Sequence, residues 1–219
     1  MSGRTASSSR PASVVSVDVV LVAYRDRKLH VHAEPLKKTR GVSLPWGLQA
    51  KGESLDAVAT RIASGVLGFA PRWMEQVGAF ADGSTHPGGS TLSVCYAGVV
   101  PWAASEFWRD IQSVSAFGER QRRMVAATLA AIRSRLEQAP IAFSFLERDF
   151  TLSDLQQTYE TILGRRLHKA SFRRALQAAF VVEPTGEWRS EGRGRPAQLY
   201  RYSPRKRKNI RRGVRLDLL

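Results

Sequence analysis

Runs of apolar residues in the first half of the chain predict strands around a single helix. Two such runs flank a short polar turn at 25–28, as in a β-hairpin. A loop with glycines at 41–52 leads into a segment where apolar residues recur at helical spacing. The expected elements are strands at 14–24, 29–33, 74–80 and 91–100 and a helix at 55–67. This pattern predicts a mixed α/β domain.

The second half has a different pattern, which predicts mainly helices. Segment 118–138 has apolar residues at helical spacing and is followed closely by Pro140, where we place a domain boundary. Beyond it the pattern predicts helices at 153–163 and 169–179 and strands at 181–183 and 197–202. Helix, short turn, helix and hairpin are typical of a winged helix. The expected organisation is a tail at 1–13, a first domain at 14–139 ending in a linker or dimer helix at 118–138, a winged helix at 140–204 and a basic tail at 205–219.

The charge of the chain adds a partner class. The 219 residues include 34 Lys and Arg against 19 Asp and Glu, a net charge of +15, with 43% hydrophobic residues. The apolar share is sufficient for a core. Residues 140–219 hold 17 of the basic groups against 8 acidic ones. Such an imbalance is typical of proteins that bind a polyanion, and nucleic acid is the leading candidate.

Cysteine content and hydropathy exclude several other classes. The single cysteine, Cys95, allows neither an internal disulfide nor a thiolate zinc site and favours a reducing compartment, so we expect a cytoplasmic protein. The most apolar stretch, 14–24, is far shorter than the roughly 20 residues of a membrane-spanning helix. No membrane partner is expected.

Residues 47–69, GLQAKGESLDAVATRIASGVLGF, resemble the Nudix box of a family of pyrophosphate hydrolases. The matching positions are Gly47, Glu53, Arg61, Gly68 and Phe69. Where the family has three helix carboxylates, this chain has Ile62, Gly65 and Val66. At about 100° per residue these three positions share one helix face, which in the family holds Mg²⁺ against a pyrophosphate. Because the face is apolar here, we expect no metal, no cofactor and no hydrolysis.

A purely structural interpretation of the box is also open. In it, Gly47 and Gly68 are ordinary loop and helix-end glycines, and the apolar positions of the helix form a core stripe of Leu55, Val58, Ile62 and Val66. A Nudix-like domain without carboxylates retains the means to bind a nucleotide in an apolar cleft. The candidate ligand residues are Arg40 for phosphates and Trp46, Phe80 and Tyr96 for stacking a base, although each aromatic also suits a core position.

The helix expected at 169–179 has two different faces. Apolar positions predict that Phe172, Leu176, Ala179 and Phe180 point inward, which turns the other face toward a DNA groove. Candidate DNA contacts are Arg174, Ser171 and Gln177 for base edges, Lys169 and Arg173 for phosphates, and Arg189, Arg193 and Arg195 in the wing. A solvated hairpin is the alternative for the wing. The run at 205–215 either binds DNA non-specifically or is a solubilising end.

Both halves together resemble the Nudix-related transcriptional regulators of NAD metabolism (NrtR-type). In that family a Nudix-like α/β/α domain precedes a winged helix-turn-helix, an α+β two-domain fold. The specific stretches are FTLSDLQ at 150–156, FRR at 172–174 and GRPA at 194–197. The resemblance implies a homodimeric repressor of NAD biosynthesis genes controlled by ADP-ribose, NAD or ATP. Departures at 167–171 and after Phe80 leave the operator and the effector open, and the altered box is nearer to the repressors of de novo NAD synthesis (NadQ-type).

Two other functions stay open at this point. A divergent Nudix hydrolase with a nucleic-acid-binding appendage would explain the paired domains, but it would lack its carboxylates. A basic RNA- or ribosome-associated protein would explain the charge but not the two domains.

Overall fold

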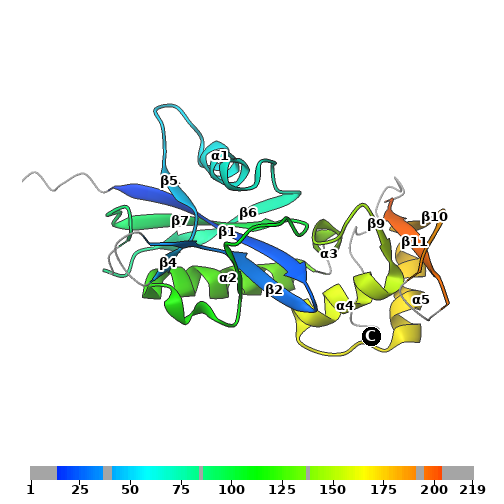
Figure 1. The fold of residues 1–219 in the computed structure, drawn as a ribbon. Coiled ribbons are helices and arrows are strands. Elements are labelled where there is room, and N and C mark those ends of the chain that lie inside the picture. The colour runs from blue at the N-terminus through cyan, green and yellow to red at the C-terminus, as the bar shows by residue number, and fades with distance from the viewer. Residues whose placement is uncertain (1–13, 37–40, 84–85, 137–138, 191–194, 204–219) are drawn as a thin grey trace, which may run out of the picture.

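A mixed sheet with a helix on each side forms the first half of the molecule (Figure 1). The computed structural model describes residues 14–36, 41–83, 86–136, 139–190 and 195–203. The strand order is β6-β7-β1-β2-β8, with β5 also paired to β1. The strands are β1 (Val15–Arg25), β2 (Lys28–His32), β5 (Trp46–Leu48), β6 (Trp73–Phe80), β7 (Leu92–Val99) and β8 (Trp108–Asp110). β1 and β7 are parallel, and the other neighbouring pairs are antiparallel.

Strand β1 is buried on both faces, which explains why its sequence is almost continuously apolar. Val19 and Leu21 pack with helix α1 (Leu55–Leu67). Val20 and Val22 belong to the core that contains helix α2 (Glu119–Arg135). The two helices therefore cover opposite faces of the sheet, as Figure 1 shows.

Several short elements complete this half. They are β3 (Glu34–Pro35), β4 (Val42–Ser43) and a 3-10 turn (Val114–Ala116), while the short helix α3 (Ile141–Ser144) begins the second half. Cys95 lies inside the sheet, where burial raises the pKa of its thiol to about 12 and keeps it protonated. In the described ranges, no helix has the length and hydropathy needed to cross a membrane.

The second half is a winged helix. It consists of β9 (Asp149–Thr151), α4 (Leu152–Leu163), α5 (Lys169–Ala179), β10 (Val182–Arg189) and β11 (Ala197–Tyr202), with the sheet order β10-β11-β9. A capping box joins Thr151 and Asp154 at the start of α4. Gln156 and Glu160 hold the turn between the helices, because they bond the Leu167 carbonyl and N–H at 3.0 and 2.9 Å.

The longer expected elements agree closely with the structure, whereas the short elements β5, β8 and α3 are not expected, and β5 lies within the predicted loop at 41–52. Helices 55–67 and 169–179 and strand 197–202 have the expected bounds. The strand expected at 181–183 instead continues to Arg189. Strand β9 is not expected, because its three residues resemble the beginning of α4. Phe180 is 44% exposed rather than inward, since α5 ends before it and its φ of 50° turns the chain away.

The core continues from one half into the other. Ile132 of α2 belongs to the same buried cluster as Tyr159 of α4. Arg133 Nε donates to the Ile162 carbonyl in the last turn of α4, at 2.8 Å. Tyr159 in turn contacts Phe172 of α5, with ring centroids 5.3 Å apart. Helix α2 therefore links the sheet to both helices of the winged helix.

Candidate ligand site and nucleic-acid interface

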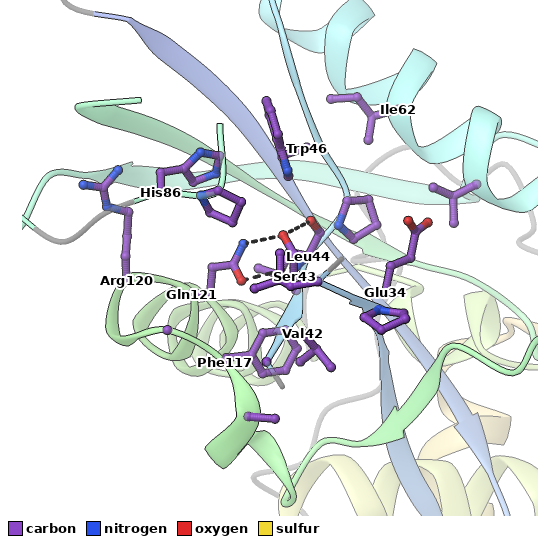
Figure 2. A pocket seen from close by; sticks show the side chains of 18 of the residues that line it. Glu34, Val42, Ser43, Leu44, Trp46, Ile62, His86, Phe117, Arg120 and Gln121 are labelled. Carbon is purple, nitrogen blue, oxygen red and sulfur yellow. Dashed lines mark hydrogen bonds between the residues drawn. The ribbon is translucent and has the colours of Figure 1, made fainter. Parts of the chain in front are cut away.

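A cavity of about 1240 Å³ lies between α1, the first turn of α2 and the segment 41–46 (Figure 2). Its lining is mostly apolar, with Val42, Leu44 and Phe117 among the side chains. The few polar side chains come from separate elements. A large, mainly apolar hollow with a few placed polar groups is the usual form of a small-molecule site.

The wall of the cavity formed by α1 is apolar. Ile62, Gly65 and Val66 line it, which confirms that these three positions share a face. The carboxylate of Glu53 is turned to Arg61 instead, with Nε–Oε1 and Nη2–Oε2 distances of 2.8 and 2.9 Å. These hydrogen bonds lower the pKa of Glu53 to about 2, so the pair is permanently charged at neutral pH. It fixes the loop before α1.

The magnesium ion that the Nudix resemblance implies does not fit these residues. Mg²⁺ requires oxygen ligands, normally including one or two carboxylates. Glu34 is the one carboxylate among the described residues that line the cavity. The described ranges also contain no group of three His, Cys, Asp or Glu side chains placed to hold a metal.

The opposite wall is the first turn of α2, where two polar side chains are buried. Gln121 donates to Ser43 Oγ at 3.2 Å and accepts from the Leu44 N–H at 3.4 Å, so it ties α2 to the segment that carries Trp46. Arg120 is 3% exposed, and its Nε lies 3.0 Å from Asp82 Oδ1. These contacts connect the cavity wall to α2.

A buried polar network lies at one end of the cavity and includes His86, which also lines it. The His86 Nδ1 atom accepts the Gly88 N–H at 3.0 Å, so the ring proton is on Nε2 and is donated to Asp18 Oδ1 at 2.9 Å. The other Asp18 oxygen accepts the Ser16 hydroxyl at 2.8 Å. The His86 ring meets the Trp46 ring edge to face, with centroids 5.0 Å apart. Every polar atom of His86 is thus satisfied inside the protein.

The structure brings one of the expected ligand residues to the cavity. Trp46 lines it. Phe80 packs against the main core instead, and Tyr96 is 3% exposed and donates to Asp56 Oδ1 at 2.7 Å. Burial and this bond raise the pKa of Tyr96 to about 12. Arg40 lies outside the described residues.

Sequence reasoning missed the polar side chains of the cavity, namely His86, Arg120 and Gln121. Each belongs to a segment of unremarkable composition, and each bonds a segment far away in the chain. The separation is 68 residues for His86 and Asp18 and 77 for Gln121 and Leu44. The partner of His86 is Asp18 on β1, and nothing in the sequence around His86 points to that strand.

Helix α5 presents a basic, exposed face. Phe172 and Leu176 are buried as expected, while Lys169, Arg173, Arg174 and Gln177 are exposed and Ser171 is half-buried. The helix follows the turn after α4, as the second helix of a helix-turn-helix does. Its exposed face therefore suits a DNA groove, and the individual contacts stay predictions.

The wing presents fewer free arginines than its sequence suggests. Arg189 is paired with Asp154 in the first turn of α4, at 2.5 Å, so it braces β10 against that helix. Arg195 is exposed at the start of the returning segment. Arg193 lies outside the described residues. Trp188, 57% exposed, adds an apolar group to this side of the hairpin.

Comparison with known proteins finds similarity in both halves. Residues 142–202 match the family model of the NrtR DNA-binding winged helix domain. The ADPR responsive transcriptional repressor NtrR of Acinetobacter baylyi is 26% identical over 214 residues, covering 90% of this chain and 84% of the relative. Shewanella oneidensis NrtR, solved with a 27mer DNA, has a TM-score of 0.76 and 25% identity over 87% of this chain and 94% of that one. A MutT/nudix family protein from Enterococcus faecalis shares the fold, with a TM-score of 0.65 and 18% identity over 87% and 88%.

A Nudix-like domain with an apolar cavity, joined through α2 to a winged helix, is the two-domain architecture of NrtR-type transcriptional regulators. Within that class the winged helix matches the NrtR DNA-binding domain. The chain as a whole is similar to the Acinetobacter repressor and to Shewanella NrtR.

Proposed function

We propose that the protein is a homodimeric repressor of NAD biosynthesis genes whose DNA affinity is controlled by a nucleotide in the cavity. The observation that carries the proposal is that helix α2 contacts both the cavity and the winged helix. Its first turn lines the cavity through Gln121, and its last turn bonds α4 through Arg133. If the protein has two conformations that differ in the position of this helix, a ligand that binds one of them more tightly shifts the equilibrium towards it. The factor by which the ligand changes the affinity for DNA then equals the factor by which DNA changes the affinity for the ligand.

ADP-ribose is the first ligand to test, because the Acinetobacter relative is named as ADPR responsive. NAD and ATP are the other two effectors implied by the sequence. The cavity volume of about 1240 Å³ accommodates any of the three. We propose that the ligand is bound and released unchanged, since the α1 wall has Ile62, Gly65 and Val66 where a metal-binding face would need carboxylates.

The proposed DNA-reading surface is the exposed face of α5. Arg174, Ser171 and Gln177 would contact base edges, and Lys169 and Arg173 would contact phosphates. Arg195 and Arg193 would add backbone contacts from the wing. Two protomers related by a two-fold axis would place two such helices on the half-sites of a palindromic operator. The proposed division between the halves is near Pro140, and the place of action is the cytoplasm.

The test is a footprint on the upstream region of the protein's own gene and of NAD biosynthesis genes, followed by titration of the protein–DNA complex with ADP-ribose, NAD and ATP. We expect a palindromic footprint and a change in DNA affinity with one of the three nucleotides. Isothermal titration of the free protein with the same nucleotides measures the reciprocal side of the coupling. Binding of none of them, or binding without any change in DNA affinity, would refute ligand control.

A further inference from the structure

Trp46 is held in a fixed position at the cavity wall by His86 and Gly88, which pack against its indole ring. Its ring is half-buried and lines the cavity, so part of the indole faces the space that a ligand would occupy (Figure 2). The His86 ring meets it at an interplanar angle of 83°. Edge-to-face contact of this kind fixes the orientation of both rings.

Gly88 fixes the indole from a second direction. A methyl group added at Gly88 would lie 2.3 Å from Trp46 Cη2 and 2.4 Å from Cζ3, far inside van der Waals contact. The backbone of Gly88 does not have a positive φ, so its conformation does not require glycine. Glycine is required at this position because the indole approaches it so closely.

The groups that hold Trp46 are themselves immobile. His86 has no exposed side-chain surface and bonds Asp18, which is likewise buried, on strand β1. The Gly88 N–H donates to His86 Nδ1, so the glycine and the histidine form one unit. The sheet therefore supports the indole through Asp18, His86 and Gly88 in turn.

We infer that Trp46 is a preorganised stacking platform for the aromatic base of the nucleotide, with Gly88 and the Asp18–His86 pair as its positioning residues. This inference rests on the proposed binding of a nucleotide in the cavity and specifies which part of the ligand lies where. An aromatic side chain already locked in place loses no conformational freedom when a base stacks on it. Stacking on an aromatic side chain also depends little on the identity of the base, because every base has a flat aromatic face.

The experiment compares two glycines of the sheet domain in the full-length protein. Gly88→Ala displaces the indole, whereas Gly78→Ala is the matched control, because Gly78 lies on β6 away from the cavity and a methyl group there makes only an ordinary 3.8 Å contact with Phe80. We expect Gly88→Ala to weaken ADP-ribose by about tenfold or more, the range for loss of one base–aromatic stack. Gly78→Ala is expected to leave the affinity within about twofold. Titration calorimetry gives both values, and circular dichroism confirms that the variants are folded.

Variants of the platform itself separate stacking from simple filling of space. Trp46→Phe keeps an aromatic face and is expected to retain most of the affinity, while Trp46→Leu is expected to lose it. Ribose 5-phosphate lacks the base, so it should bind to all four variants and to the unchanged protein with the same affinity.

Three results would overturn the inference. Unchanged ADP-ribose affinity in both Gly88→Ala and Trp46→Leu would show that the base lies elsewhere. An equal loss for ribose 5-phosphate in Gly88→Ala would indicate general distortion of the cavity rather than loss of stacking. Failure of the unchanged protein to bind ADP-ribose, NAD or ATP at all would refute the proposed function together with this inference.

Discussion

Removal of the Arg133 guanidinium is expected to weaken the coupling between ligand and DNA without abolishing either binding reaction. Arg133 Nε donates to the Ile162 carbonyl at 2.8 Å, and this bond joins the last turns of α2 and α4. The residue contacts neither the cavity nor the exposed face of α5. Arg133→Ala therefore changes the connection between the two sites and leaves the sites themselves intact.

The expected magnitude follows from the type of bond and its exposure. A hydrogen bond from a charged group contributes about 1.5–3 kcal/mol when it is well shielded. Arg133 is exposed to solvent, so about 1 kcal/mol is a better value here. Coupling energies between two sites are typically about 1–3 kcal/mol. Loss of 1 kcal/mol corresponds to about a fivefold smaller effect of the ligand on DNA affinity.

The assay is the dissociation constant for operator DNA with and without saturating ADP-ribose, measured for the unchanged protein and two variants. Arg135→Ala is the matched control, because Arg135 lies on the same turn of α2 but bonds Glu75 of the sheet at 3.1 Å instead of α4. The ratio of the two constants should fall in Arg133→Ala and stay constant in Arg135→Ala. An unchanged ratio in Arg133→Ala would refute the role of this contact in coupling.

Three further predictions concern the reading helix, the altered box and a buried histidine. Arg174→Ala should cost about 1–3 kcal/mol of specific operator affinity, while Lys169→Ala should weaken all DNA alike and reduce the salt dependence by about one unit, both measurable by binding titrations in different salt concentrations. The protein should form no product from ADP-ribose, NAD or ATP with Mg²⁺ or Mn²⁺, and sustained turnover that Glu53→Gln abolishes would disprove this. Burial lowers the pKa of His32 to about 4 from 6.5, so the folded state resists protonation and loses stability as the pH falls from 6.5 to 4. The loss of about 3 kcal/mol, from about 1.4 kcal/mol per pKa unit, should be reduced in denaturant unfolding of His32→Phe.

The sequence predicted the elements and the apolar α1 wall because both depend on local spacing. The positions of Ile62 and Val66 follow from the 3.6-residue period, and the cavity confirms them. The inward set on α5 follows in the same way up to Phe172 and Leu176. Phe180 does not point inward with this set, because the helix ends one residue before the apolar pattern does.

The remaining features depend on contacts between distant segments, which periodicity does not contain. His86 joins the cavity because the sheet brings Asp18 beside it, 68 residues away in the chain. Arg189 is a brace rather than a free wing arginine because Asp154 lies 35 residues before it. A charge pattern alone predicts the kind of partner that such side chains bind. It does not predict whether another residue of the same protein already pairs with them.

The continuous core has a consequence for how the molecule opens. A single buried cluster reaches from Val31 of the sheet to Phe172 and Val181 of the winged helix, so separating the halves would expose apolar surface on both. The amides of α5 are therefore released to solvent together with those of the sheet, in one cooperative unit. A nucleotide at a hundred times its dissociation constant adds about 2.7 kcal/mol to the folded state. Hydrogen exchange in α5 should then slow by nearly the same factor as in β1, although the ligand touches neither helix of the winged helix.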